Sequence, residues 1–161
     1  GGSASKQPCI AAGQHTDKIG SADCSMCPSG HACPPGIIHP VACSAGSFQA
    51  LNGSSECNRC AKGTYQEEEG ASTCNACPET QTTQGAGSNT RSDCGCAEGF
   101  FFGNNQCEAC PRGMACSGFG GENMVKPGYY SELPADPSKG VWLCLSDKVC
   151  VGQNQSSSDN L

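Results

Sequence analysis

Large hydrophobic residues stand along this chain only in short groups, separated by long stretches of Gly, Ser, Thr, Asn and Cys. The most apolar groups lie at residues 100–102, 124–130 and 141–145. The sequence Gly-Asn-Asn at 103–105 follows the first group, so that group predicts a short strand that runs into a turn. We expect the other two groups to be strands of one small sheet.

The pattern contains no convincing helix. The three glutamates at 67–69 are too few, and Gly70 follows them directly. No segment approaches the run of roughly 18 apolar residues that a membrane-spanning helix needs. We therefore expect an elongated array of short β-hairpin and loop modules, with little regular secondary structure and no helix of note.

The centre of the chain is a repeat. When residues 43–60 are shifted by 17 positions, they fall on residues 60–77 without a gap. The matched positions include Cys43 with Cys60, Gly46 with Gly63, Phe48 with Tyr65, Gln49 with Gln66, Gly53 with Gly70, Cys57 with Cys74 and Cys60 with Cys77. A fixed short period is typical of an array of small units that contact only their neighbours. We expect the repeated glycines to take turn conformations that are closed to other residues.

Weaker copies flank the two clear repeats. Residues 9–24 have His15 near the aromatic position. Residues 77–94 keep Gly87, but Thr82 stands where the aromatic residue is expected. We therefore expect the repeat to extend in both directions with altered packing.

A second, longer period relates residues 24–33 to residues 107–116 at an offset of 83. The prolines between residues 34 and 42 predict an extended, stiff connection. The predicted division is a disordered lead-in at 1–8, a cysteine-rich module with its Pro-rich connection at 9–42, repeats at 43–94, a further module at 95–116, a disulfide-closed β piece at 117–150 and a disordered tail at 151–161.

Composition explains what could hold such units together. Leu, Ile, Val and Phe number 19 of 161 residues, too few for an ordinary apolar core. Cysteine accounts for 16 residues, a proportion typical of a disulfide scaffold. Disulfides persist in oxidising compartments, so we expect the secretory lumen or the cell exterior. The net charge of −6 disfavours nucleic acid and anionic membranes as partners.

The spacing of the cysteines predicts sequential pairing. The expected loops of hairpin size are Cys9–Cys24, Cys43–Cys57, Cys60–Cys74, Cys77–Cys94 and Cys96–Cys107, and elimination leaves Cys27–Cys33, Cys110–Cys116 and Cys144–Cys150. Each loop of about 15 residues would stabilise the fold by roughly 3 kcal/mol. A crossed arrangement at the end, joining Cys110 to Cys144 and Cys116 to Cys150, fits the spacing as well.

The CxxC pairs also allow a zinc hypothesis. The spacing Cys57-x2-Cys60-x13-Cys74-x2-Cys77 is close to that of a zinc ribbon. However, no basic or helical segments lie between the pairs, so we favour disulfides and expect no metal and no cofactor. The three histidines, at positions 15, 31 and 39, are expected in exposed loops, and none belongs to a recognisable nucleophile motif. No catalytic residue is expected.

Two kinds of surface site are predicted. Asn52 and Asn154 begin N-glycosylation sequons. Large aromatic residues are candidates for a partner surface, since a chain without a deep core can leave one face of them exposed. These are Phe101, Tyr129, Tyr130 and Trp142.

Several of these motifs resemble a known family. Cys60-Ala-Lys-Gly-Thr-Tyr with the later Gly70 and Cys74-x-x-Cys77 is similar to ephrin-receptor-like cysteine-rich repeats, also called Gly-Cys-Cys modules. Residues 95–116 resemble an ephrin-receptor-like or EGF-like module. Residues 110–150 resemble the piece that often follows such repeats in large protist surface proteins. The resemblance implies an extracellular, disulfide-bonded, non-enzymatic module of a larger secreted or surface protein.

The sequence therefore predicts a structural module, a disulfide-stapled spacer in a larger ectodomain that takes part in adhesion or assembly. Its partners would be other extracellular proteins or neighbouring domains of the same chain, without nucleic acid and without direct membrane insertion. An alternative is a ligand-binding receptor segment whose contact surface lies within residues 119–143.

Overall fold

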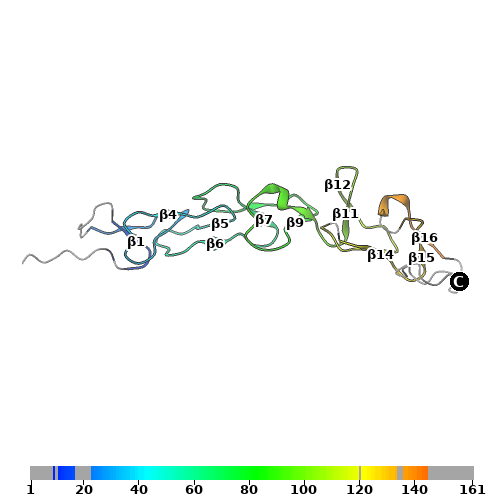
Figure 1. Cartoon of the computed structure of the whole chain (residues 1–161), viewed down its shortest axis with the longest axis horizontal. Coiled ribbons are helices and arrows are strands. Elements are labelled where there is room, and N and C mark those ends of the chain that lie inside the picture. The colour runs from blue at the N-terminus through cyan, green and yellow to red at the C-terminus, as the bar shows by residue number, and fades with distance from the viewer. Residues whose placement is uncertain (1–8, 10, 17–22, 120, 134–135, 145–161) are drawn as a thin grey trace, which may run out of the picture. The chain divides into compact units, whose positions relative to one another are not determined.

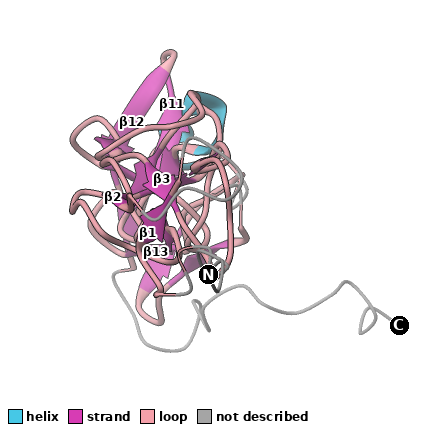
Figure 2. Cartoon of the chain, turned by 90° about the vertical axis from the view of Figure 1, so that its left-hand side faces the viewer, coloured by secondary structure: helices cyan, strands magenta, loops and turns pink. Residues whose placement is uncertain are grey.

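The computed structural model of the chain describes residues 9, 11–16, 23–119, 121–133 and 136–144 (Figure 1). These residues form a small disulfide-rich fold of short two-stranded pairs. Helical structure within them is limited to two 3₁₀ turns, η1 (Arg91–Asp93) and η2 (Pro137–Lys139). Figure 2 shows how much of the ribbon is loop and how short most strands are. The predicted fold class is confirmed in these respects.

Every described strand pairs with the next strand of the sequence or with the one before it. The pairs are β1 (Gln14–His15) with β2 (Ser25–Met26), β3 (His31–Ala32) with β4 (Val41–Ala42), β5 (Ser47–Phe48) with β6 (Asn58–Arg59), β7 (Thr64–Tyr65) with β8 (Asn75–Ala76), β9 (Gln81–Thr82) with β10 (Gly95–Cys96), β11 (Phe100–Gly103) with β12 (Gln106–Ala109), β13 (Met114–Cys116) with β14 (Asn123–Val125), and β15 (Tyr129–Tyr130) with β16 (Trp142–Leu143). Such local pairing suits a chain whose covalent links are also local.

The described residues fall into two compact units. Unit 1 holds the residues up to 78 and residues 82–94, and unit 2 holds residues 79–81 and those from 95 onward. Within unit 1, the cysteine-to-cysteine modules follow one another in sequence order (Figure 1).

Seven disulfides close loops in order along the chain. They join Cys9 to Cys24, Cys27 to Cys33, Cys43 to Cys57, Cys60 to Cys74, Cys77 to Cys94, Cys96 to Cys107 and Cys110 to Cys116. Five of these are the pairs that the loop lengths predict, and Cys27–Cys33 and Cys110–Cys116 are pairs that elimination leaves. The Cys110–Cys116 bridge rules out the crossed arrangement. The partner predicted for Cys144, Cys150, lies outside the described residues.

The same backbone hydrogen bond closes four hairpin modules of unit 1. The carbonyl of an early glycine accepts the N–H of the cysteine that ends the module, for example Gly46 from Cys60 and Gly63 from Cys77, both at 2.9 Å. Gly46 and Gly63 have φ of +81° and +87°. An L side chain rarely adopts such a φ, so the turn explains why glycine repeats at this position.

Further backbone hydrogen bonds join successive modules of unit 1. The late glycine of a module donates its N–H to the first cysteine of the preceding module. The four bonds of this kind run from Gly36 to Cys9 (3.2 Å), Gly53 to Cys27 (2.7 Å), Gly70 to Cys43 (2.8 Å) and Gly87 to Cys60 (2.8 Å). The modules are therefore bound to one another by main-chain contacts and not only by the covalent chain.

A second set of bonds runs in the opposite direction. The early glycine donates to the following module, from Gly13 to Cys33 (2.9 Å), Gly30 to Gln49 (2.7 Å) and Gly46 to Gln66 (2.8 Å). Tyr65 also forms a parallel bridge with Ser88 of the next module. Modules of unit 1 thus both donate to and accept from their neighbours.

Modules two positions apart in the sequence also touch. A Cβ placed on Gly13 would overlap the carbonyl of Gly53, and one on Gly30 would overlap the carbonyl of Gly70. The expectation that each unit contacts only its neighbours is therefore wrong. The glycines lack the side chain that would keep the two backbones apart, so alternate modules come into contact.

Sulfur fills much of the interior. Seven of the twelve buried hydrophobic side chains in the described residues are cysteines. Buried polar side chains accompany them, among them Gln49, Gln66 and Thr83. The interior is thus built from disulfides and hydrogen-bonded polar groups, as the scarcity of large apolar residues requires.

The β11–β12 hairpin confirms the strand and turn predicted at residues 100–105. Phe101 lies opposite Glu108 and Phe102 opposite Cys107. Asn104 and Asn105 both have positive φ, 49° and 61°. This is the conformation that a two-residue hairpin turn needs, and asparagine tolerates it better than most residues.

The C-terminal apolar groups pair differently from the single sheet that was expected. Residues 123–125 pair with residues 114–116, whereas Tyr129 and Tyr130 pair with Leu143 and Trp142. Pro127 and Gly128 separate the two strands of the 124–130 group, and proline cannot donate the hydrogen bond that would continue a strand. The group is therefore split between two small sheets.

The segment around residues 34–42 is also different from its prediction. It does not remain extended, because His31 pairs with Ala42 and Ala32 with Val41. A turn at 35–36 reverses the chain, and Gly36 there has a φ of +79°. Residues 27–43 are thus another hairpin module, closed by the short Cys27–Cys33 loop.

Candidate functional site

An aromatic pair lies on the last described hairpin of unit 2. Tyr130 and Trp142 face each other across β15 and β16, with ring centroids 6.3 Å apart. Tyr130 is 42% exposed and Trp142 is 50% exposed. Leu143 and Leu133, nearby in the sequence, are exposed as well. Two of the predicted surface residues therefore do combine high exposure with mutual contact.

The other two predicted surface residues are less accessible. Tyr129 is half-buried, with its ring close to Gly113, where an added Cβ would strike it. Phe101 is buried, so its assignment to a partner surface is wrong. Successive side chains of a strand point to opposite faces, and Phe102, 69% exposed, takes the outer position instead.

A hollow of ≈ 620 Å³ in unit 2 adjoins this strand. It is lined by Cys96, Phe100, Phe101, Phe102, Gly118, Gly121, Glu122, Asn123, Asp136 and Pro137. The hydroxyl of Ser138 donates a hydrogen bond to the Asp136 carboxylate, and this bond is the main reason that the pKa of Asp136 lies below its ordinary value. The backbone N–H of Ser138 and the charge of Lys139 act in the same direction.

Asn52 lies in an exposed turn of unit 1. Its Oδ1 accepts a hydrogen bond of 2.7 Å from the backbone N–H of Ser29 in the preceding module. The carbonyl of Ser54, the third residue of the sequon, accepts the N–H of Cys33 at 2.9 Å. This sequon therefore also helps to join two modules. The second predicted sequon residue, Asn154, lies outside the described residues.

The zinc hypothesis does not fit the sulfur chemistry. Cys57, Cys60, Cys74 and Cys77 are all in disulfides, so none of them offers the thiolate that zinc binds. The described residues also contain no cluster of three or more His, Cys, Asp or Glu side chains able to hold a metal ion.

The histidines occupy three different environments. His39 is exposed and His31 is half-buried. His15 is buried in β1, at the position that Phe48 and Tyr65 take in later modules. The expectation that all three histidines are exposed is therefore wrong for His15, where the planar ring serves as the aromatic residue of its module.

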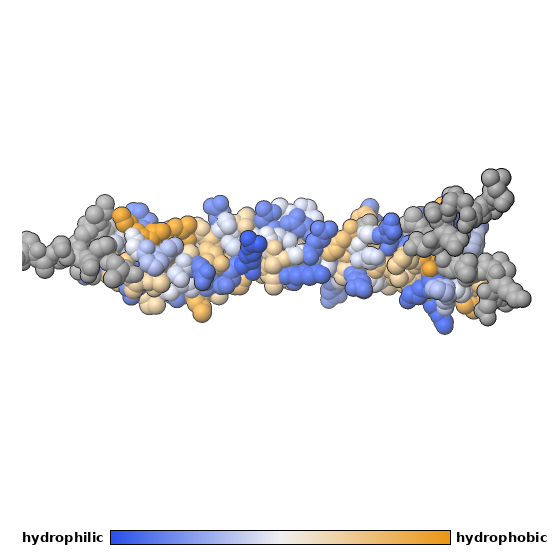
Figure 3. All heavy atoms as spheres, turned by 60° about the horizontal axis from the view of Figure 1, so that its bottom comes forward, coloured by the Kyte–Doolittle hydropathy of each residue, from blue (hydrophilic) through white to orange (hydrophobic). Residues whose placement is uncertain are grey.

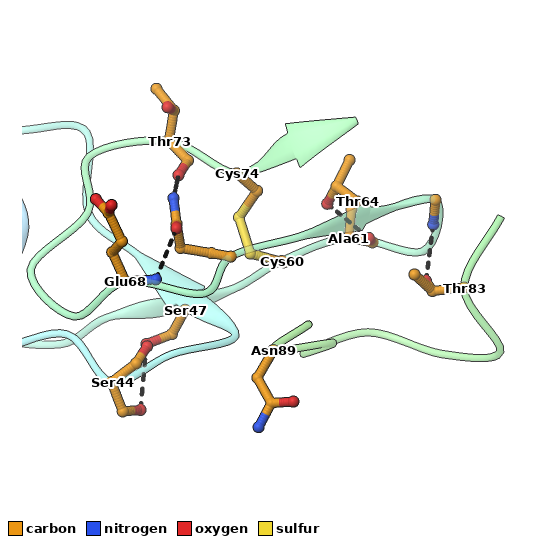
Figure 4. The surroundings of a disulfide bond; sticks show 12 residues. Ser44, Ser47, Cys60, Ala61, Thr64, Glu68, Thr73, Cys74, Thr83 and Asn89 are labelled. Atoms are coloured by element: carbon orange, nitrogen blue, oxygen red, sulfur yellow. Dashed lines mark hydrogen bonds between the residues drawn. A yellow bond between two sulfur atoms is a disulfide. The ribbon is translucent and has the colours of Figure 1, made fainter. Parts of the chain in front are cut away.

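Two glutamines have a structural role that the repeat pattern marks but does not explain. The Gln66 carboxamide donates to the carbonyl of Thr73 (2.7 Å) and accepts from the N–H of Glu68 (2.9 Å). Figure 4 shows Thr73 and Glu68, with the dashed lines of these two bonds, beside the Cys60–Cys74 bridge. Gln49 makes the corresponding bonds with Glu56 and Leu51. Each glutamine therefore ties together the loop that its own disulfide closes.

The module at 77–94 has different residues at two repeated positions, that of the glutamine and that of the early glycine. Thr83 stands in the glutamine position, fully buried, and its hydroxyl accepts the N–H of Gly63 at 2.9 Å (Figure 4). Thr80 stands in the position of the early glycine and has a φ of +68°. A β-branched residue in that conformation is strained. Thr80 lies 17 residues after Gly63, so the repeat period alone could have identified it as the residue that replaces the early glycine.

The face of the described residues drawn in Figure 3 is mixed in character. Figure 3 shows hydrophilic and hydrophobic residues interspersed over the face that is drawn. None of the helical pieces in the described part of the chain has the length and hydrophobicity needed to cross a membrane.

The fold and the bridges define a class of protein, a disulfide-bonded array of hairpin modules. The family model described as tyrosine-protein kinase ephrin type A/B receptor-like matches residues 46–94. That stretch is an ephrin-receptor-like cysteine-rich region, as the resemblance predicted. This family is a non-catalytic module of receptor ectodomains, and its disulfides fit an extracellular or secreted location. A comparison with curated proteins gave no match.

Proposed function

We propose that the chain is a disulfide-stapled spacer in the ectodomain of a larger secreted or membrane-anchored protein that takes part in adhesion or assembly. The observation that carries this proposal is the two-way set of backbone hydrogen bonds between modules of unit 1. Modules linked only by flexible chain would bend at every CxxC junction. Modules that also share main-chain bonds resist bending, so unit 1 would hold its first and last modules at a fixed separation.

Single-molecule FRET on the full chain tests this proposal. Fluorophores on non-canonical residues at the exposed positions Ser25 and Asn75 would span successive modules of unit 1. A spacer gives one narrow distance distribution in the oxidised protein, which broadens on reduction with a phosphine. Labels at Asn58 and Asn75 provide the short-range control. A broad distribution for Ser25 and Asn75 in the oxidised protein contradicts the proposal.

The alternative is ligand binding by residues 119–143. The exposed Tyr130–Trp142 pair favours it, because amphipathic aromatic side chains dominate the energy of many interfaces. In this case the partner would be another extracellular protein. Trp142→Ala in the full chain should then abolish saturable binding to cells, whereas Phe102→Ala, on another exposed aromatic residue, should leave it unchanged. Equal binding by wild type and Trp142→Ala excludes this alternative.

We also propose that Asn52 carries an N-glycan. Its exposure supports this, and its Nδ2, which would bear the sugar, is not the atom that accepts the Ser29 bond. In full chain secreted from eukaryotic cells with Asn154→Gln, mass spectrometry should find a glycan at Asn52. Ser54→Ala should remove the glycan while keeping the Asn52 side chain. An unmodified Asn52 in the secreted protein contradicts the proposal.

A further inference from the structure

A second hollow, of ≈ 480 Å³, lies on the surface of unit 1. Its lining is small and polar apart from one long cationic side chain. The residues that form it are Ser44, Ala45, Gly46, Ser47, Cys57, Arg59, Ala86 and Gly87. Residues 86 and 87 belong to a module further along the chain than the other six, so the hollow exists only because the modules are packed together.

Arg59 is the charged group of this hollow. No carboxylate of the described residues forms an ion pair with it. Its aliphatic stem lies over Gly87, since a Cβ on that glycine would meet Cδ of Arg59 at 3.5 Å and Cγ at 3.8 Å. The stem is therefore held along the hollow, and within the described residues the guanidinium has no acidic partner, in a chain whose net charge is −6.

Comparison with the other modules shows that the fold does not require this charge. The residues that precede the closing cysteine of the other modules are Met26, Ala42 and Ala76. Met26 packs toward Gly53 and Ala42 toward Gly70, in the same way that Arg59 packs toward Gly87. Methionine and alanine serve the packing equally well, so the guanidinium is free for another purpose.

Neutral hydrogen-bonding groups line the hollow together with Arg59. The Ser47 hydroxyl donates to the carbonyl of Ser44 at 2.7 Å and lies 3.5 Å from the Ser44 hydroxyl. Asn89 lies beside Gly46, its Cβ 3.5 Å from a Cβ placed there. Its carboxamide makes no hydrogen bond within the described residues (Figure 4). The hollow therefore offers one planar cation together with hydroxyl groups, and the Asn89 carboxamide belongs to a residue beside its wall at Gly46.

We propose that this hollow binds a carboxylated sugar of an acidic glycan, with Arg59 as the carboxylate-binding residue. The planar fork of guanidinium N–H donors matches the two oxygens of a carboxylate. The Ser44 hydroxyl and the Asn89 carboxamide suit sugar hydroxyls. A docked peptide would require an apolar anchor pocket, and the lining offers only alanine and a disulfide for one.

NMR titration of the ¹⁵N-labelled, fully oxidised chain with sialyllactose tests the proposal, with lactose as the neutral control and a glucuronate oligosaccharide as a second acid. We expect sialyllactose to shift the amide signals of Ser44, Ser47, Arg59 and Gly87, and lactose to shift none. Because one charge-assisted contact dominates, the affinity should be in the millimolar range and should weaken with added salt.

Arg59→Met is the decisive variant, because it keeps a stem over Gly87 as Met26 does over Gly53. It should lower the affinity by at least about tenfold. Arg59→Lys should lose part of the affinity, and Lys62→Met, which removes an exposed cation outside the hollow, should lose none. Equal binding by Arg59→Met, equal shifts with lactose, stronger binding of a polyglutamate peptide, or no shift at ligand concentrations on the order of 10 mM would each overturn the proposal.

Discussion

The residue that departs most clearly from its repeat is Thr80. It occupies a turn position where the corresponding residues are glycines, and its φ of +68° places a β-branched side chain in the left-handed region. For an L residue this conformation costs roughly 1–2 kcal/mol. The repeat therefore stores strain at this position, and replacing the residue by glycine would remove that strain.

Thr80→Gly should raise the free energy of unfolding by about 0.5–1 kcal/mol, since the relief of strain exceeds the added freedom of the unfolded chain. The midpoint of denaturant unfolding, measured on the oxidised protein, reports this change. Thr82→Gly is the matched control. Thr82 lies in β9 without a positive φ, so its replacement should destabilise the fold. A lower midpoint for Thr80→Gly would show that Thr80 is not strained.

The buried glutamines make a second prediction at this scale. Gln66→Ala leaves the Thr73 carbonyl and the Glu68 N–H without their partner, which should cost about 1–3 kcal/mol. Gln84→Ala, at an exposed position of the next module, should change the free energy of unfolding by less than about 0.5 kcal/mol. If both variants unfold at the same denaturant concentration, the carboxamide of Gln66 does not stabilise its loop.

At the scale of elements, the β11–β12 hairpin carries a large apolar side chain on each face. Phe101 is buried and Phe102 is 69% exposed, although the two are adjacent in the sequence. Phe101→Ala should therefore cost about 3 kcal/mol, whereas Phe102→Ala should cost less than about 0.5 kcal/mol. Thermal unfolding of the two variants, each with its disulfides intact, measures the difference. If Phe102→Ala destabilised the fold more than Phe101→Ala, the strand would bury the face that carries Phe102 and not the face that carries Phe101.

The sequence predicts where the hairpins lie more reliably than it predicts which face of each hairpin is buried. Loop lengths between cysteines predict five of the seven bridges, whereas Cys110–Cys116 could not be told from a crossed pairing by spacing alone. The sequence Gly-Asn-Asn is enough to predict the β11–β12 turn. Three consecutive phenylalanines carry no alternation, so they cannot show that Phe101 and not Phe102 is inside. The prolines at 34 and 35 favour an extended segment. Gly36, which lies 17 residues before Gly53, nevertheless stands at a repeated glycine position, and it is there that the chain reverses.

The contacts between modules are the least predictable feature of the molecule. They are made chiefly by backbone atoms, for instance from Gly70 to Cys43 and from Gly46 to Gln66. Such bonds leave no hydrophobic period in the sequence. The repeated glycines and glutamines do mark the positions involved, but identity alone does not show whether they serve the turn, the neighbouring module or both. The hollow at Arg59 escapes prediction for the same reason, since residues from different modules form it.

At the scale of the whole molecule, the central claim is that main-chain bonds between modules, together with the disulfides, replace an apolar core. Native-state hydrogen exchange by NMR on the oxidised chain tests it most directly. The amides of Gly46, Gly70 and Gly87, which donate between modules, should exchange as slowly as that of Cys60, which closes a hairpin. Exchange of these three glycine amides at the rate of an unstructured peptide, with Cys60 still protected, would show that the modules are joined by little more than the chain itself.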